Sequence, residues 1–600
     1  MGEGNYTLTP SRYPHSMDSG SDRRTLWGDA LCAFALAAIM TLAWAWRDWS
    51  NLTALRLPDT DDMMRLQQIR DWLGGQAFSD LSQHRLGPAP GLAMHWSRLA
   101  DLVPGGIIAA LTPLVGVHAA EMTAVILWPA ALFGAALLLV TRIARAIGGS
   151  EIARTALIVA AIAYPVTTIF LPGRIDHHGL QIVLLLLIAR TLVAGPSMGH
   201  GLVAGLAATA SLVIGMETAP LIAAAGAAMT IEWIATRHGA DDRMMGFGIS
   251  LGAGLLFASI VFRSEQWTYA ACDGFTAVLW RGALVAAFAP MLMALAARDV
   301  TRPMARTGLA FAVSAVIGGG IMLVAPQCLS PYGAVDPILA KLWLGRVGEA
   351  QPLFAAPLGI AIGYAGVMVA GLGASGWRFH TTRDARWAAL LLVQAAALAL
   401  TCYQLRGAYG GAILAAPGLA AVIAAARTRG AGWMAGAWIA SAGMLYPLAA
   451  DALVPGAPTP AAQQGGGDCT SPGALALLRT LPTGRMIAPL DLGAYAIGST
   501  GLNMIGAPYH RNDAGNLASY RFFLGDEAEA RTIAQEWHIT YVAYCPGSFG
   551  ELGNDMTAAP RTIGRLMQDK PPAWLVPVVR SNALVAYRVE PGLLDRSRSR

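Results

Sequence analysis

Residues 155–188 read TALIVAAIAYPVTTIFLPGRIDHHGLQIVLLLLI and place a short ionisable cluster between two runs that are each apolar enough to lie in lipid. The cluster is Arg174-Ile175-Asp176-His177-His178-Gly179. A carboxylate and two imidazoles at a membrane boundary are costly to desolvate unless they face a partner or a cation. Carboxylate oxygen suits magnesium or manganese, and manganese also accepts imidazole, so the cluster predicts a functional site. The alternative is a polar group that only marks a helix end at the water interface.

The composition predicts an integral membrane protein. Of 600 residues, 55% are hydrophobic and 13% are charged, about half the charged fraction of soluble domains. The net charge of +5 comes without a basic run, so nucleic acid is not an expected partner. The long apolar runs stop near Asp451, so we expect a soluble domain over residues 451–600.

The apolar runs of residues 26–450 predict about thirteen membrane-spanning helices. Polar residues 1–25 are expected to be disordered, and their arginines keep this end in the cytoplasm. The predicted spans are 26–46, 121–141, 155–171, 179–195, 200–216, 218–236, 244–262, 276–297, 307–324, 354–374, 386–403, 408–426 and 431–450. Arginine then falls in the cytoplasmic loops throughout, as the positive-inside rule requires. We therefore expect a bacterial inner-membrane protein whose loops 47–118 and 325–353 and C-terminal domain are periplasmic.

The first external loop holds a second acidic group, Asp59-Thr60-Asp61-Asp62. Apolar residues recur at helical spacing from Met63 to Leu73, which predicts an amphipathic helix in the membrane interface. One aspartate explains its N-cap, but three adjacent carboxylates repel one another unless something positive holds them, which favours a cation site. Residues 99–114 are too short and too broken for a span, so we expect a second interfacial helix there.

Three further charged residues are expected to face outward. Glu349 lies in loop 325–353 near Arg346, although an ordinary solvated loop would also contain such a pair. Arg406 lies between two spans, where its planar donors suit phosphate oxygens, and the alternative is contact with lipid headgroups. Glu217 lies at an outer turn.

In their order and spacing these parts resemble the catalytic subunit of oligosaccharyltransferase and its single-subunit bacterial and archaeal relatives, within the GT-C class of polyprenol-dependent glycosyltransferases. Asp59-Thr60-Asp61 resembles the first acidic motif, whose second acid binds the metal. Asp176-His177-His178 is similar to the archaeal second motif, whose first and third residues bind it. Residues 347–352 resemble the external-loop motif whose glutamate completes the site and touches the acceptor, and Arg406 matches the arginine that meets the donor pyrophosphate. The resemblance implies a polytopic α-helical GT-C membrane protein with a C-terminal periplasmic α/β domain.

The expected site combines these motifs around a Mg2+ or Mn2+ cofactor. The expected roles are catalysis by Asp61 and Glu349, metal binding by Asp61, Asp176, His178 and Glu349, donor-phosphate binding by Arg406 and Arg174, and supporting or acceptor-side positions for Asp59, His177, His95, Trp96 and Asp491.

The C-terminal domain departs from the family at the Trp-Trp-Asp-Tyr-Gly motif that recognises an Asn-containing sequon. The corresponding residues 488–495 keep Asp491 and Gly493 but contain no tryptophan. Recognition of a sequon is therefore in doubt, and the acceptor stays open among protein, lipid and glycan. Residues 508–512 follow where the family has an Asn-rich segment, and the alternative there is a surface turn.

The expected activity is transfer of a sugar or oligosaccharide from polyprenyl phosphate or pyrophosphate to this acceptor. A divalent ion and an arginine neutralise the leaving phosphate, and a carboxylate orients the acceptor or takes its proton. One alternative is a related GT-C enzyme that moves a single sugar to a lipid or glycan. Another is a non-enzymatic transporter of lipid-linked sugars, which would place its charges near the bilayer midplane rather than at one surface.

The C-terminal domain reads as α/β after a Pro-Gly-Gln-rich linker over residues 455–467. Residues 485–490, 540–544, 574–579 and 583–588 predict strands, and residues 527–537 and 561–567 predict helices. Four cysteines, Cys272, Cys328, Cys469 and Cys545, are expected to face outward, where an oxidising compartment permits a disulfide such as Cys469–Cys545.

Overall fold

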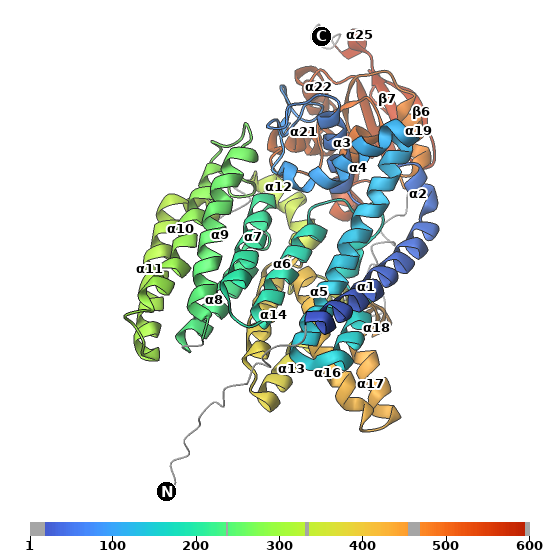
Figure 1. The fold of residues 1–600 in the computed structure, drawn as a ribbon. Helices are drawn as coiled ribbons and strands as arrows, with labels where there is room; N and C mark the ends of the chain where they lie inside the picture. Colours follow the sequence, from blue (N-terminus) through green and yellow to red (C-terminus); the bar gives the residue numbers. More distant parts are fainter. Residues whose placement is uncertain (1–18, 236–237, 330–334, 454–467, 595–600) are drawn as a thin grey trace.

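The computed structural model describes residues 19–235, 238–329, 335–453 and 468–594 (Figure 1). A bundle of long helices carries at one end the C-terminal domain together with the first external loop. The predicted disordered segment lies outside the described residues up to residue 18. Helix α1 begins at Ser19, so the prediction of disorder is wrong for residues 19–25. A helix formed by the apolar span extends into the polar residues before it at little cost, because only nucleation is costly.

The helices of the bundle follow the predicted spans closely. Among the described residues, eight helices are long and apolar enough to cross a membrane, and α6, α7 and α8 are shorter apolar helices. The count of thirteen crossings therefore stays a prediction. The bounds are α1 Ser19–Arg47, α5 Val117–Ala161, α6 His178–Val193, α7 Met198–Ile214, α8 Ala219–Ile234, α9 Ala240–Val261, α10 Ala277–Ala296, α11 Pro303–Val324, α13 Leu358–Thr382, α14 Ala385–Tyr403, α15 Gly407–Leu414, α16 Ala416–Arg427, α17 Ala431–Ser441 and α18 Leu445–Leu453.

Three parts of the bundle differ from the predicted spans. The predicted span 431–450 is divided into the two short helices α17 and α18, and neither is long enough to cross a membrane. Residues 142–154, predicted as a cytoplasmic loop, are helical, because α5 continues through them and kinks at Gly149, whose φ of 78° glycine adopts without strain. The predicted span 155–171 leaves α-helical geometry after Ala161 and continues as a 3-10 helix over Val166–Phe170. At this break the Met444 N–H, between α17 and α18, donates to the Ile162 carbonyl (3.2 Å). Broken backbone is tolerated in a membrane domain where it is buried against protein.

The first external loop is packed into the C-terminal domain. It contains α2 (Trp49–Thr53), α3 (Thr60–Leu73), the short strands β1 (Ser82–Gln83) and β2 (Leu92–Ala93), and α4 (Leu102–Val115). Both predicted loop helices are therefore present. Helix α3 lies in protein rather than on lipid, because α20 (Leu490–Ser499) packs against it and buries its apolar face. Side-chain hydrogen bonds also connect this loop to the C-terminal domain. The Tyr495 hydroxyl donates to the Leu57 carbonyl (3.2 Å), and Arg85 donates to the carbonyls of Ile497 (2.8 Å) and Thr500 (2.7 Å).

The C-terminal domain is α/β, as predicted. Its sheet has the strand order β4-β3-β5-β7-β6, in which β3 is parallel to β4 and β5 while β7 is antiparallel to β5 and β6. The strands are β3 Arg485–Ile487, β4 Asn503–Met504, β5 Tyr541–Tyr544, β6 Leu575–Arg580 and β7 Val585–Val589, with helices α19 Pro472–Arg479, α20, α21 Asp513–Leu524, α22 Glu527–Glu536, α23 Asn554–Thr557, α24 Thr562–Met567 and α25 Pro591–Leu594. All four predicted strands and both predicted helices are confirmed, whereas β4, α19, α20 and α21 were not predicted. The predicted linker, residues 455–467, lies outside the described residues.

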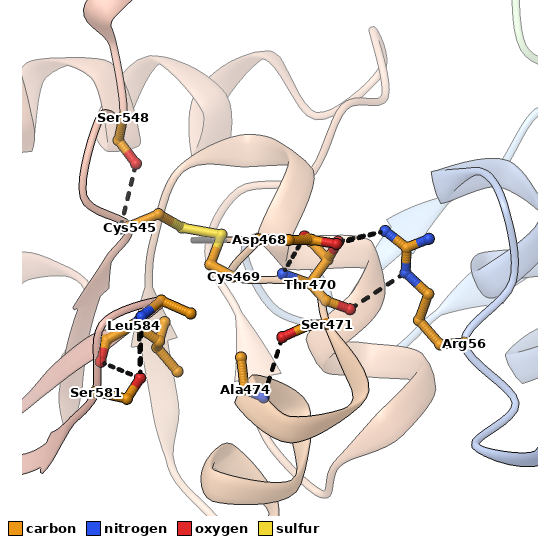
Figure 2. Close-up of a disulfide and its surroundings, with 11 residues drawn as sticks. Arg56, Asp468, Cys469, Thr470, Ser471, Ala474, Cys545, Ser548, Ser581 and Leu584 are labelled. Carbon is orange, nitrogen blue, oxygen red and sulfur yellow. Dashed lines mark hydrogen bonds and ion pairs between the residues drawn. A yellow bond between two sulfur atoms is a disulfide. The ribbon is translucent and has the colours of Figure 1, made fainter. Parts of the chain in front are cut away.

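The disulfide Cys469–Cys545 is confirmed, and it fastens the start of the C-terminal domain to the end of β5 (Figure 2). Arg56 of the first external loop reaches the same place, where it donates to Asp468 (3.1 Å) and to the Thr470 hydroxyl (2.8 Å) (Figure 2). A second disulfide, Cys272–Cys328, joins the loop between α9 and α10 to loop 325–353.

Candidate active site

A cavity of about 1680 Å³ lies between the C-terminal domain and the end of the bundle that carries it. Its walls come from the first external loop, the segment before α6, loop 325–353, the C-terminal domain and the connections between α7 and α8, α9 and α10, and α14 and α15. The predicted site residues that line it are Asp59, Asp61, His95, Arg174, Asp176, His177, His178, Glu349, Arg406 and Asp491. The fold therefore brings together all but one of the residues singled out from sequence.

Trp96 is the exception. It is only 3% exposed and does not line this cavity, so of the two predicted positions the acceptor-side one does not fit, and a supporting position stays a prediction. Its ring packs behind the cavity wall, against the Arg65 guanidinium (4.8 Å from the ring centroid) and edge-on to Tyr509. An indole that packs against a cation and a ring is stabilised better here than in water.

Asp59 and Asp61 enter the cavity from the start of α3. Asp59 is the N-cap, as predicted for one aspartate of the group, and its carboxylate accepts a hydrogen bond from the Asp61 backbone N–H (3.2 Å). Burial, followed by the charges of Asp59, Asp176 and Glu349, raises the pKa of Asp61 to about 8. This carboxylate is therefore stabilised by a proton or by a cation.

Asp62 serves a different purpose from its two neighbours. It is fully buried, and its Oδ1 accepts hydrogen bonds from the backbone N–H groups of Ile175 (2.8 Å) and Asp176 (2.9 Å). Burial raises the pKa of Asp62 well above its ordinary value, although Arg174 opposes this. Asp62 thus fastens the Asp176 segment to α3, and the sequence had grouped it only with the candidate cation ligands.

Arg174 lies among three carboxylates. Its Nη1 is 2.8 Å from Asp59 and 3.3 Å from Asp62, and its Nη2 is 2.7 Å from Asp176. Burial opposes ionisation of Asp176, but the charges of Arg174 and His178 outweigh it and hold the pKa of Asp176 well below its usual range. The predicted role of Arg174 in binding donor phosphate stays a prediction, because its contacts here are with carboxylates.

His178 is placed as a ligand would be. It begins α6, its backbone N–H donates to Asp176 Oδ1 (3.0 Å), and its Nδ1 lies 3.2 Å from Asp176 Oδ2. Both ring nitrogens are buried, and neither makes a hydrogen bond of good geometry. Since buried polar atoms are normally paired, these nitrogens suit an ion.

His177 belongs to a chain of polar contacts behind this ligand set. Its Nδ1 lies 3.4 Å from Arg65 and its Nε2 lies 3.3 Å from Glu217, which also accepts from Gln181 (2.9 Å). Burial opposes ionisation of Glu217, but His177 outweighs it and holds the pKa of Glu217 well below its usual range. Arg65 is 1% exposed and is paired with Asp101 (2.5 Å). Neither Arg65 nor Gln181 carried a signal in the sequence, because their partners come from distant segments.

Glu349 and Arg406 meet across the cavity wall. Arg406 Nη2 lies 3.3 Å from Glu349 Oε1, and the Arg406 N–H donates to the Glu349 carbonyl (3.0 Å). The Tyr409 hydroxyl donates to Glu349 Oε2 (3.2 Å). Loop 325–353 is therefore attached to the start of α15 at the residue expected to be catalytic.

The four predicted metal ligands share the cavity without forming a compact ligand set. Among the described residues, three or more potential ligand atoms lie within 4.8 Å of one another only at His95, Asp273 and His510. Asp61, Asp176, His178 and Glu349 must therefore approach one another to hold one ion, which their carboxylate charges oppose until the ion is present. The residues around His510 are also not a surface turn, since His510 lines the cavity and Asn512 is 1% exposed.

No known family model matches the sequence, and no curated protein matches it. Similar solved structures exist for the oligosaccharyltransferase AglB of Archaeoglobus fulgidus. With an inhibitory peptide and a dolichol-phosphate bound, it has a TM-score of 0.67 at 14% identity over 95% of this chain and 75% of that chain. Its complex with Zn and sulfate has a TM-score of 0.62 at 15% identity, over 94% of this chain and 73% of that chain. The form tethered to an acceptor peptide that contains the NVT sequon has a TM-score of 0.64 at 14% identity, over 95% of this chain and 75% of that chain.

Proposed function

We propose that this chain, which has the GT-C fold of an oligosaccharyltransferase, is a membrane glycosyltransferase that uses a polyprenyl-linked sugar donor. The sugar or oligosaccharide passes from polyprenyl phosphate or pyrophosphate to an acceptor at the outer face of the membrane. In this proposal the protein lies in a bacterial inner membrane with its N-terminus in the cytoplasm and its cavity in the periplasm.

One observation carries the proposal: Asp61, Asp176, His178 and Glu349 come from three segments that are far apart in the chain and line one cavity. A structural role could explain one buried acid. It does not explain why four potential metal ligands line the same cavity as Arg406. Perturbed ionisable groups that converge in a large cavity are the usual mark of an active site.

These residues fit a divalent cation. The Nε2 of His178, which is buried without a hydrogen-bond partner, and the raised pKa of Asp61 both indicate groups that a cation would stabilise. We propose Asp61, Asp176, His178 and Glu349 as its ligands, and the imidazole favours manganese over magnesium. When bound, the ion would neutralise the phosphate of the donor.

The chain itself supplies the remaining chemistry. Glu349 orients the acceptor and takes its proton as the acceptor atom attacks the anomeric carbon. The bond from that carbon to the phosphate oxygen breaks, the polyprenyl phosphate leaves with the bonding electrons, and the configuration inverts in this single displacement. Arg406, now paired with Glu349, is in reach of the site to meet the leaving phosphate through its planar donors.

The acceptor class stays open among protein, lipid and glycan. Asp491 lines the cavity from α20, yet residues 488–495 hold no tryptophan to bind a sequon. Single-sugar transfer from a polyprenyl monophosphate uses the same metal and acid, so it differs from this proposal only in donor and acceptor.

The test is turnover of the purified protein with a pool of polyprenyl-linked sugars and Mn2+. Asp176→Ala and Glu349→Gln should each lower the rate roughly 10²–10⁴-fold. Glu536→Gln is the matched control, because this exposed glutamate of α22 lies outside the cavity. Equal turnover in all four proteins would reject the assigned site. Sugar found on a peptide, a lipid or a glycan would decide the acceptor.

A further inference from the structure

Three potential ligands meet in the cavity wall apart from the proposed catalytic set. His95 belongs to the first external loop, Asp273 to the loop between α9 and α10, and His510 to the segment before α21. One ligand atom from each lies within 4.8 Å of the others. The three are half-buried and line the main cavity.

Asp273 is held in place from two sides. His510 Nε2 lies 2.6 Å from its Oδ2, and Arg511 contacts it with both Nε (2.7 Å) and Nη2 (2.6 Å). The neighbouring Cys272 is disulfide-bonded to Cys328, and Gly274 approaches the His95 carbonyl so closely that a Cβ there would lie 2.4 Å from it. The carboxylate and the His95 backbone are therefore fixed next to each other.

His95 carries the observation that points to a ligand. Its Nδ1 is buried and has no hydrogen-bond partner, while its ring lies 4.9 Å from the ring of His510. Burial keeps the pKa of His95 well below its usual value. A buried imidazole nitrogen without a hydrogen-bond partner would be stabilised by a metal ion.

We propose that His95, Asp273 and His510 form a second metal site, selective for zinc, with its remaining coordination position open to the cavity. Two imidazoles and one carboxylate are a typical ligand set for zinc with an open position. Arg511 cancels much of the Asp273 charge, which weakens binding of hard cations such as Mg2+ and Ca2+ that depend on carboxylates. The imidazoles then determine the selectivity, and they favour zinc.

The geometry requires only small movements. Ligand atoms around tetrahedral zinc lie roughly 3.3 Å apart. His510 and Asp273 must therefore separate slightly from 2.6 Å, and the atoms now up to 4.8 Å apart must approach by about 1.5 Å. Arg511 remains behind the carboxylate as its hydrogen-bond donor, in the way that metal-binding carboxylates are commonly supported.

This site would join the membrane bundle to the C-terminal domain. Its ligands come from segments far apart in sequence, so zinc would hold the bundle loop with Asp273 against the domain that carries His510. Zinc should then raise the thermal stability of the protein, because a ligand that binds the folded state alone stabilises it. This inference does not rest on the proposed glycosyl transfer.

The experiment measures zinc bound to the full-length protein in detergent, by elemental analysis and by competition with a chromophoric chelator. We expect Asp176→Ala, which alters the other ligand set, to keep one zinc equivalent, whereas the unmodified protein can bind a second zinc at that other set. His95→Ala and His510→Ala should each weaken zinc binding at least 10-fold and abolish the rise in melting temperature. His84→Ala, which removes an exposed histidine of the same external loop, should change neither.

X-ray absorption at the zinc edge gives a readout that is independent of folding defects in variants. Two imidazoles and one or more oxygen ligands are expected for the unmodified protein. The proposal is overturned if the folded protein binds no zinc, or if His95→Ala and His510→Ala bind it as tightly as the unmodified protein. It is likewise overturned if the spectrum lacks imidazole.

Discussion

Replacing Asp62 tests whether this aspartate stabilises the fold through its hydrogen bonds, in contrast to Asp61, which is a proposed cation ligand. In the folded protein Asp62 Oδ1 accepts two backbone hydrogen bonds, from Ile175 (2.8 Å) and Asp176 (2.9 Å), in a fully buried place. Asp62→Ala leaves both N–H groups buried without a partner. Each such loss costs about 1–3 kcal/mol, so the free energy of unfolding should fall by about 2–6 kcal/mol. Asp62→Asn keeps a carbonyl oxygen at the same place, and we expect a loss of about 1 kcal/mol.

The assay is equilibrium unfolding in detergent followed by tryptophan fluorescence, together with Mn2+ affinity. Since the bonds to Asp62 position Asp176, Asp62→Ala should also weaken Mn2+ binding about 10–100-fold, the usual effect of removing a group that orients a ligand. Asp61→Asn is the contrasting variant, and it should weaken Mn2+ binding while the protein keeps its stability. The reasoning is refuted if Asp62→Ala is as stable as the unmodified protein. It is also refuted if Asp62→Asn is as damaging as Asp62→Ala, because then the charge of Asp62 matters and not its hydrogen bonds.

Three further predictions concern the catalytic glutamate, a disulfide and the topology. Tyr409→Phe removes the hydroxyl that donates to Glu349 (3.2 Å), and turnover should fall roughly 10-fold while Mn2+ affinity changes little; an unchanged rate would show that this hydrogen bond does not position the carboxylate. Replacing Cys469 by serine removes the disulfide of the C-terminal domain, and the free energy of unfolding of that domain should fall by about 2–5 kcal/mol relative to the unmodified protein. Denaturation of both proteins without a reductant measures the difference, and equal stability of the two would contradict it. Asp569→Cys, on the C-terminal domain, should react with a membrane-impermeant maleimide in intact spheroplasts, whereas Thr381→Cys, near the end of α13, should react only after lysis; the reverse pattern would invert the predicted topology.

The positions of the helices and strands could be predicted because they depend on local patterns. Apolar runs of about 20 residues predict spans wherever they occur, and the strands Tyr541–Tyr544 and Val585–Val589 follow from short runs of β-branched and aromatic residues. The same reasoning failed at residues 142–154, because nothing local distinguishes a polar loop from a polar stretch of helix that ends at a kink. It also missed α20, because the glycines in this segment lower its intrinsic helix propensity. Packing against α3 stabilises the helix in spite of them.

The candidate site was predicted as a list of residue types, without its contacts. Asp61, Asp176, His178 and Glu349 could be named because acids and imidazoles beside apolar runs are costly and therefore conspicuous. Asp62 could not be distinguished from Asp61, since only the position of the Ile175 and Asp176 backbone shows which acid points inward. The roles of Trp96, behind the cavity wall, and of Asp273, beside His510, likewise depend on segments that are distant in the chain.

The amino-acid order by itself determined which stretches form long apolar helices, where these stop, and which charged residues lie between them. These properties follow from the free energies of transferring short segments from water to lipid, which depend on local sequence and not on the tertiary structure. Only the tertiary structure decided which carboxylates pair with Arg174, which acid supports the loop before α6, and that two histidines and an aspartate from three segments meet. Such pairings depend on distances between segments hundreds of residues apart, and those distances exist only after the bundle and the C-terminal domain have packed together.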